Sequence, residues 1–255
     1  MDAFAQLVQR ARLRLLQMHF ESRVGHIGGN LSCLDTLMTL YHQVLLPQDA
    51  FVLSKGHAAG ALYVTLWSRG VLADEDLQQF HRDNTRLSGH PAPGFLPQIP
   101  FATGSLGHGL PLAGGMALGK RLKGEAGRVF CLTSDGEWEE GSNWEALLFA
   151  AHHRVAPLTI IVDANGLQGF GSTAEVSGLE PLAAKFRAFN LPVTEVDGHD
   201  LAALECALNA PAAGARVLVA RTQKGRGVSY MEDRMEWHYL PMTPAQYQQA
   251  VKEQG

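Results

Sequence analysis

The sequence predicts an α/β fold, a doubly wound and mainly parallel sheet with helices on both faces. Short apolar runs alternate along the chain with longer segments of helical periodicity. Glycine is frequent, with 27 residues, which suits tight turns between strands and helices. Hydrophobic residues make up 46% of the 255 residues and charged residues 18%, as in an ordinary globular protein. No shift in composition marks a second domain, so residues 1–255 are expected to form one domain.

Each element follows from a local pattern. The first helix is amphipathic, with apolar side chains near helical spacing and arginines mostly elsewhere. Strands are expected at residues 51–54, 129–133, 158–162, 193–196 and 216–220. Helices are expected at residues 2–20, 34–44, 58–68, 74–83 and 201–208, from the glycines at 104–109 to about 121, after the strand at 129–133, and from Pro244 onward.

Two segments are expected to lack regular structure. Three glycines within residues 25–29 should break the chain between the first two helices, because glycine destabilises a helix interior. Residues 87–103 contain four prolines and predict a long loop. A loop of this length in a compact domain is usually functional or mobile.

Composition excludes several classes of protein. The net charge of −4 and the lack of a basic run argue against a general nucleic-acid binder. No apolar run approaches the roughly 20 residues that cross a bilayer, and the N-terminus has no signal-peptide pattern. The three cysteines, Cys33, Cys131 and Cys206, lie far apart, which favours reduced, buried thiols. We therefore expect a cytoplasmic location.

Polar side chains follow two of the predicted strands. Asp135 comes directly after the run at 129–133, and Asn165 follows the run at 158–162. In an open parallel sheet, ligands bind in the crevice outside the carboxyl ends of the strands. Carboxylate and amide oxygens suit Mg2+, which also keeps its hold on substrate phosphates. Gly136, without a Cβ, allows a phosphate to approach the backbone closely.

A glycine-rich segment at residues 104–109 precedes a predicted helix. Free N–H groups and the helix dipole make such a turn a candidate anion site. Taken alone the signal is weak, because the segment lacks the lysine of a P-loop and does not follow a clear strand.

The order of short motifs along the chain is more specific. The motifs are Gly25-His26, Ser54-Lys55-Gly56-His57-Ala58, Ser88-Gly89-His90-Pro91, Gly104-Ser105-Leu106-Gly107, Ser134-Asp135-Gly136 with Glu140-Gly141, Asn165, Asp197-Gly198-His199-Asp200 and Trp237-His238. An Asp-Gly pair followed about thirty residues later by Asn resembles the thiamine diphosphate motif. The whole order resembles the transketolase family over nearly the entire chain.

The resemblance is to the first half of that family only, its diphosphate-binding domain. Full-length members are more than twice as long and carry a pyrimidine-binding domain and a C-terminal domain. The resemblance therefore implies that these two domains lie on a separate partner chain. That half carries the family's glutamate that starts ylide formation and most of the arginines that hold the sugar phosphate. This chain is expected to be inactive alone.

The resemblance also implies a cofactor site. Asp135 and Asn165 would hold Mg2+ by their side chains and Leu167 by its carbonyl, with Ca2+ or Mn2+ as substitutes for Mg2+. Gly136 would donate its N–H to the diphosphate of thiamine diphosphate. The segment beneath the cofactor, meeting its aminopyrimidine ring, would be Gly104, Ser105, Leu106 and Gly107. Each of Asp135 and Asn165 alone would be read as an ordinary turn residue.

Four histidines would line the cleft in the resembled family. His26 and His238 are the candidates for moving protons, and His90 would hold the hydroxyl end of the donor sugar. His57 and His238 would contact the diphosphate. Histidine can lose and gain a proton near neutral pH, as cleavage of a ketose and attack on an aldose require. The remaining histidines are assigned to packing or to the surface, and His199 is assigned a structural role.

Glu140 and Glu145 resemble carboxylates that lie at the subunit interface of the family and couple paired active sites. The alternative for both is a solvated acidic residue on a helix. Three positions depart from the commonest family pattern: Ser134, Ile27 and His108. These departures bear on the substrate more than on the cofactor.

The sequence thus predicts the N-terminal subunit of a split transketolase, a transferase that moves a two-carbon ketol unit from a ketose to an aldose. A heterotetramer with two copies of each chain is expected. Three alternatives remain: a non-catalytic cofactor-binding or regulatory subunit, a transketolase-like enzyme acting on a modified or nucleotide-linked sugar, and an enzyme similar to deoxyxylulose-phosphate synthase. The last is disfavoured because that enzyme is normally one long chain.

Overall fold

A five-stranded parallel sheet forms the centre of the molecule in the computed structural model, which describes residues 2–155 and 157–254. The strands lie in the order β1-β2-β3-β7-β6, and all four pairings are parallel. Their bounds are β1 (Ala50–Leu53), β2 (Val129–Ser134), β3 (Leu158–Ala164), β6 (Val193–Asp197) and β7 (Arg216–Arg221). The predicted fold class and the five predicted strands are confirmed. A separate antiparallel pair, β4 (Leu167–Gln168) and β5 (Gly171–Ser172), follows β3.

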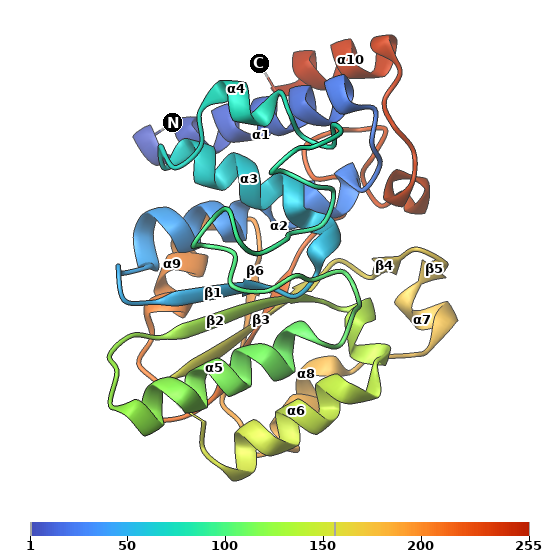
Figure 1. The fold of residues 1–255 in the computed structure, drawn as a ribbon. Coiled ribbons are helices and arrows are strands. Elements are labelled where there is room, and N and C mark those ends of the chain that lie inside the picture. Colours follow the sequence, from blue (N-terminus) through green and yellow to red (C-terminus); the bar gives the residue numbers. More distant parts are fainter. Residues whose placement is uncertain (1, 156, 255) are drawn as a thin grey trace.

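Helices cover both faces of the sheet (Figure 1). On one face lie α2 (Ile27–Thr39) and α9 (Leu201–Asn209), with α1 (Ala3–Ser22), α3 (Ala59–Ser68), α4 (Asp74–Leu77) and α10 (Pro244–Gln254) stacked outside them. On the other face lie α5 (Gly109–Lys123), α6 (Gly141–His152) and α8 (Leu182–Arg187). The short α7 (Thr173–Val176) lies beside β5, and tight helical turns occupy Leu40–Val44, Gly56–Ala58, Gly136–Glu139 and Met235–His238.

The sheet separates two hydrophobic cores. Successive side chains of a strand point to opposite faces. Along β2, Phe130 and Leu132 therefore join the core under α2, whereas Val129 and Cys131 join the core under α5 and α6. Both faces of the central strands are buried, which explains why these strands are almost continuously apolar in sequence.

The start of α2 differs from the prediction. The helix begins at Ile27, so Gly28 and Gly29 occupy its first turn instead of breaking the chain. A Cβ on Gly28 would lie 3.1 Å from Lys224 Cγ and 3.2 Å from Trp237 Cβ. Close packing against the segment after β7 therefore outweighs the low helix propensity of glycine. The helix α4 is also shorter than predicted, and α7 and α8 were not predicted.

Cys206 corrects a second expectation. Cys33 and Cys131 are buried as predicted, but Cys206 is exposed on α9, where it lies on the solvent side of an amphipathic helix. All three thiols are free. The predicted loop at residues 87–103 contains neither helix nor strand. Within residues 2–155 and 157–254, no helix is long and apolar enough to span a membrane.

The winding of the sheet reverses between β3 and β7. From β1 to β3 each strand is added beside the previous one, but the chain then continues to β6 at the far edge and returns to β7. The connecting helices change face at the same point, from α5 and α6 to α9. Ligands of doubly wound sheets bind at such a switch point, beyond the carboxyl ends of the strands.

His19 of α1 should make folding stability sensitive to acid. Its imidazole is 2% exposed, and burial lowers its pKa to about 4, against the opposing effect of the Val24 and Gly25 backbone. A depressed pKa in the folded state means that the unfolded chain binds the extra proton as the pH falls below about 6.5, so stability is lost there. Between pH 7.5 and pH 5, urea unfolding should show a loss about 2 kcal/mol larger for the wild type than for His19→Leu.

The control for this comparison is His152→Leu on the exposed side of α6. This variant should keep the wild-type pH dependence. Equal pH dependence in the wild type and His19→Leu would contradict the burial of a neutral imidazole at position 19.

Candidate active site

The carboxyl ends of the strands open into a cleft of about 220 Å3. The sequence-predicted residues that line it are His26, His57, His90, Gly104, Leu106, Asp135, Gly136, Asn165, Leu167 and His238. They come from the segments after β1, β2, β3 and β7 and from the start of α2. The sheet thus brings together residues spread over more than two hundred positions of the sequence.

Asp135, Asn165 and Leu167 form the candidate metal-binding set. Asp135 is 4% exposed and accepts hydrogen bonds from Gly136 N at 2.8 Å and Gly166 N at 2.5 Å. Burial, and then Asp163, raises the pKa of Asp135 to about 6, and the two amides partly oppose that rise. No cluster of three His, Cys, Asp or Glu that could hold a metal occurs among the described residues. The candidate set is therefore one carboxylate with neutral amide and carbonyl oxygens.

A buried ion pair lies directly behind this set. Asp163, at the end of β3, accepts a hydrogen bond from the ammonium of Lys55, and both side chains are almost fully buried. Burial alone would raise the pKa of Asp163 and lower that of Lys55, but each partner outweighs burial, so the pKa of Asp163 is lowered and that of Lys55 is raised. Both groups are therefore charged at neutral pH.

Asp163 also accepts hydrogen bonds from three neighbours in addition to Lys55. These are Ser32 Oγ at 2.6 Å, Thr222 Oγ1 and Asn165 Nδ2 at 3.2 Å. The amide of Asn165 is thereby oriented by the carboxylate behind it, and its Oδ1 accepts from Leu167 N at 3.1 Å. One carboxylate thus links α2 and the ends of β1, β3 and β7.

Lys224 is a cleft residue that the sequence analysis missed. It is 1% exposed, and its Nζ lies 3.4 Å from the Leu167 carbonyl oxygen and 3.2 Å from His238 Nδ1. No carboxylate forms a salt bridge with it within the described part of the chain. Burial, and then Lys55, lowers the pKa of Lys224 to about 8. The signal that could have found it is a lysine followed by glycine just past the last parallel strand.

The four predicted histidines lie together in the cleft. The ring centroid of His26 is 5.1 Å from that of His238, 5.7 Å from that of His57 and 5.8 Å from that of His90. The His57 and His238 rings are 5.4 Å apart. Four segments that are distant in sequence therefore present one group of imidazoles to the same space.

Burial is the main cause of low pKa values in this group. It lowers the pKa of His26 to about 4 and that of His238 to about 3, with smaller effects from neighbouring histidines and lysines. The pKa of His57 falls well below its ordinary value, and that of His90 is lowered. All four rings are therefore neutral at neutral pH and able to accept a proton.

His26 has an unusual backbone conformation. It forms the N-cap of α2 in the left-handed region, with φ 65° and ψ 4°, and its N–H donates to the His238 carbonyl at 3.1 Å. Such strain is uncommon for a non-glycine residue and is concentrated at functional sites. The hydrogen bond joins the start of α2 to the His238 segment, which holds both rings on the same side of the cleft.

The glycine-rich turn at 104–107 is held from outside the cleft. Gly107 N donates to Glu137 at 3.0 Å, and the Gly107 carbonyl accepts from Ser142 Oγ at 2.8 Å. Gly104 and Leu106 line the cleft, whereas Ser105 is exposed and Gly107 is buried. Glu137 itself is fully buried, and the sequence analysis did not select it.

Glu140 and Glu145 lie outside the cleft. Both are exposed, Glu140 as the N-cap of α6 and Glu145 within that helix. Their interface role remains a prediction. His199 has the structural position that was predicted, since its Nδ1 lies 2.8 Å from Asp35 Oδ2 and its Nε2 accepts from Gln223 N at 2.9 Å.

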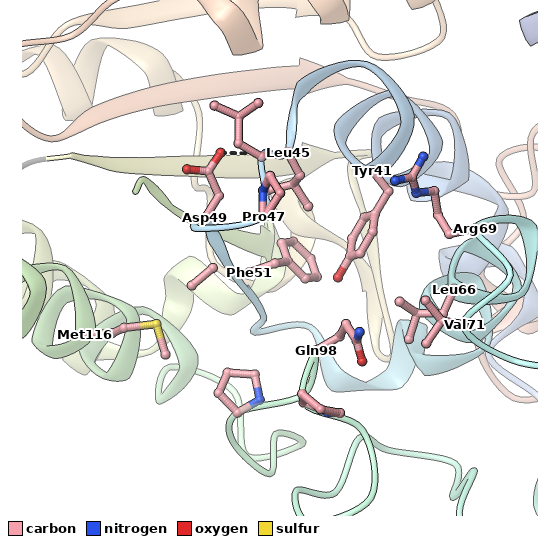
Figure 2. A pocket seen from close by; sticks show the side chains of 14 residues that line it. Tyr41, Leu45, Pro47, Asp49, Phe51, Leu66, Arg69, Val71, Gln98 and Met116 are labelled. Atoms are coloured by element: carbon pink, nitrogen blue, oxygen red, sulfur yellow. Dashed lines mark hydrogen bonds between the residues drawn. The ribbon is translucent and has the colours of Figure 1, made fainter. Parts of the chain in front are cut away.

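A larger pocket of about 450 Å3 lies at the opposite end of β1 (Figure 2). Its walls are mainly apolar, with Tyr41, Phe51 and Leu66 facing the space, and no predicted site residue lines it. Convergent polar groups with shifted pKa values mark a functional site better than volume does. The smaller cleft is therefore the candidate active site.

The cleft suits a ligand that carries a diphosphate and a divalent cation. Asp135, Asn165 and Leu167 offer oxygens to the cation, and Lys224 offers an unpaired positive charge to the anion. A Cβ on Gly136 would lie 3.1 Å from Gln168 Cβ, so glycine keeps this wall of the cleft open. The four neutral imidazoles beside these groups can accept and return protons.

Known proteins resemble this chain over nearly its whole length. The family described as "Transketolase, thiamine diphosphate binding domain" matches residues 5–255. The chain is 36% identical over 250 residues to one subunit of the apulose-4-phosphate transketolase of Actinobacillus succinogenes, covering 93% of this chain and 91% of that protein. It is 35% identical over 243 residues to SqwG, a subunit of the 6-deoxy-6-sulfo-D-fructose transketolase of a Clostridium species, covering 90% of this chain and 88% of that protein.

A solved structure shows the same fold. The transketolase from Leishmania mexicana superposes with a TM-score of 0.91 at 25% sequence identity. The match covers 98% of this chain but 41% of that one. The chain thus spans less than half the length of this solved relative.

Breaking the buried Lys55–Asp163 pair should destabilise the fold. Lys55→Met leaves the carboxylate of Asp163 buried without its cation, which typically costs about 3–5 kcal/mol. Adding Asp163→Asn to that variant removes the stranded charge and should recover a large part of the loss. The free energy of unfolding in urea measures both effects.

The control for this pair is Lys123→Met, because Lys123 lies 3.7 Å from Glu125 in an exposed pair. Its stability should change by less than about 1 kcal/mol. A Lys55→Met variant as stable as this control would show that the Lys55–Asp163 pair does not stabilise the sheet edge.

Proposed function

Since the chain belongs to the transketolase family, as its thiamine diphosphate-binding domain, we propose that it is one of the two subunits of a split transketolase. With a partner that carries the pyrimidine-binding half, it transfers a two-carbon ketol unit from a ketose to an aldose. One observation carries this function: the candidate metal ligands, an unpaired lysine and four neutral histidines converge in one cleft. The match to relatives that are themselves named as transketolase subunits, over most of their length, supports the two-subunit organisation.

The substrate is a sugar that bears an acidic group. The names of two relatives specify a phosphate group and a sulfo group, respectively, on the sugar. In our assignment, the cleft of this chain holds the reacting carbons and the cofactor, and the partner holds the acidic group. A modified sugar is thus favoured over a nucleotide-linked one.

Thiamine diphosphate and Mg2+ fit the groups that the cleft presents. Asp135 and Asn165 hold the cation by their side chains and Leu167 by its carbonyl, because the Asp135 oxygens have lone pairs beyond those used by Gly136 N and Gly166 N. Gly136 offers its N–H to the diphosphate, and His57 and Lys224 lie on the same side. When bound, the thiazolium ring supplies the carbon–carbon bond chemistry.

His26 and His238 move the proton of the reaction. A neutral imidazole accepts the proton of the donor C3 hydroxyl while the C2–C3 bond breaks and the aldehyde leaves. The resulting imidazolium returns one proton to the oxygen of the acceptor carbonyl when the new bond forms. His90 holds the donor through its hydroxyl groups. Each cycle thus ends with the same number of protons on the protein as at its start.

The partner and a second copy of this chain cover exposed apolar side chains near the cleft. Glu145, Leu148 and Phe149 follow one face of α6 at spacings of three and four, and Phe170 and Tyr239 are exposed beside the cleft. Glu140 and Glu145 then lie at the interface. The assembly is a heterotetramer with two copies of each chain, and its location is cytoplasmic.

Reconstitution tests this function. The chain is purified and assayed alone and with a C-terminal partner subunit, with thiamine diphosphate and Mg2+, a ketose phosphate, apulose-4-phosphate or 6-deoxy-6-sulfo-D-fructose as donor, and an aldose phosphate as acceptor. The pair should transfer the ketol unit and the chain alone should be silent. In the pair, His26→Ala should lower turnover about 100-fold or more, as loss of a general base does, with cofactor affinity unchanged.

His42→Ala is the control, because His42 lies away from the cleft and contacts Ser68 at 2.9 Å. Its turnover should match the wild type. Activity of the chain alone would contradict a shared active site. Silence of the pair with every donor, with cofactor binding demonstrated, would contradict the catalytic assignment.

Lys224 should contribute directly to cofactor affinity. Lys224→Met keeps the buried stem of the side chain but removes the unpaired charge, so a charge-assisted hydrogen bond to the diphosphate is lost. We expect the dissociation constant of thiamine diphosphate in the presence of Mg2+ to rise about 10-fold to 100-fold, measured by calorimetry on the reconstituted pair. Lys252→Met on the exposed side of α10 is the control. Equal affinity in both variants would refute the contact.

A further inference from the structure

Glu137 lies in the short helical turn Gly136–Glu139, two positions after Asp135. Its side chain is fully buried, and Trp138 and Asn143 beside it are also fully buried. Lys55 is the nearest cation that affects it, but Lys55 is already paired with Asp163. A buried carboxylate without a salt-bridge partner is costly, and it persists only where hydrogen bonds satisfy it.

Three donors from three different segments satisfy this carboxylate. Its Oε1 accepts from Ser54 Oγ, at the end of β1, and from Gly107 N at 3.0 Å. Its Oε2 accepts from Ser134 N, at the end of β2, at 3.2 Å. All three groups donate and none accepts, so only a carboxylate matches the set.

The contact with Gly107 fixes one end of the turn at 104–107. Gly107 has φ 85°, and a Cβ there would lie 2.7 Å from Glu140 Cβ. Its N–H is held by Glu137 and its carbonyl by Ser142 Oγ at 2.8 Å, so both polar groups of this residue bind to the segment that follows Asp135. Glu137 therefore connects the wall of the cleft that carries Gly104 and Leu106 to the wall that carries Asp135 and Gly136.

We propose that Glu137 is a positioning residue that sets the distance between these two walls and thereby the affinity for the cofactor. This inference rests on the proposed function, because the ligand that spans both walls is thiamine diphosphate. The carboxylate touches neither the cofactor nor the substrate. It acts through Gly107 and Ser134, and its loss changes the binding of the cofactor more than the turnover of the loaded enzyme.

Glu137→Gln is the decisive variant, because it keeps the shape and replaces one acceptor oxygen by an NH2 donor. Either Ser134 N or Gly107 N then faces a donor. In the reconstituted pair we expect the dissociation constant of thiamine diphosphate with Mg2+ to rise at least 10-fold. At saturating cofactor, kcat should stay within 3-fold of the wild type. Hydrogen exchange of the peptide containing residues 104–109 should become at least 10-fold faster.

Two further variants complete the design. Glu205→Gln is the matched control on the exposed side of α9 and should leave all three readouts unchanged. Ser142→Ala removes only the second contact to Gly107 and should raise the dissociation constant and the exchange rate in the same direction. It provides the test if Glu137→Gln does not fold. In the double variant, the two effects should be less than additive, because both contacts hold one residue.

The outcomes separate this inference from the function on which it rests. Failure of the wild-type pair to bind thiamine diphosphate would overturn both. Wild-type binding with unchanged affinity and exchange in the folded Glu137→Gln variant, or in Ser142→Ala if Glu137→Gln does not fold, would overturn the positioning role alone. An equal fall of kcat at saturating cofactor without any change in affinity would likewise contradict it.

Discussion

The carboxylate of Asp163 is the point on which the cleft depends. Parallel strands meet at their carboxyl ends, where backbone groups leave the ladder and need new partners. Asp163 gathers Lys55, Ser32 and Thr222 at that edge and orients the amide of Asn165. Because Lys55 compensates its charge, the carboxylate can remain ionised in the interior. Four elements are thus fixed relative to one another before any ligand enters.

A second buried carboxylate extends this order to the opposite wall. Glu137 has no cation of its own and is held by hydroxyl and amide donors, so its position depends on the geometry of three segments at once. Two buried acids therefore divide the cleft between them. Asp163 fixes the side on which Asn165 and Lys224 lie, and Glu137 fixes the turn that carries Gly104 and Leu106. The side chains that face the ligand can then remain neutral or unpaired.

The sequence was sufficient for the strands and for Asp135, Asn165 and the four histidines. Parallel strands are apolar throughout, and the polar residue after each run must lie at one edge of the sheet. It was insufficient for Lys224 and Glu137, because their burial depends on contacts with segments far away along the chain. The same reason explains α2: nothing local shows that Gly28 packs against Lys224 and Trp237, so propensity alone placed the helix start too late.

The two unpaired features of the cleft, a cation and a group of neutral bases, have one physical cause. Burial penalises every charge, so it lowers the pKa of His26 and His238 and also that of Lys224. The nearby lysines add repulsion that keeps the imidazoles unprotonated. An anionic ligand beside Lys224 opposes both effects, because negative charge favours protonated lysine and imidazole alike. The ligand that the cation attracts is therefore the one that brings the histidines closer to the pKa that proton transfer requires.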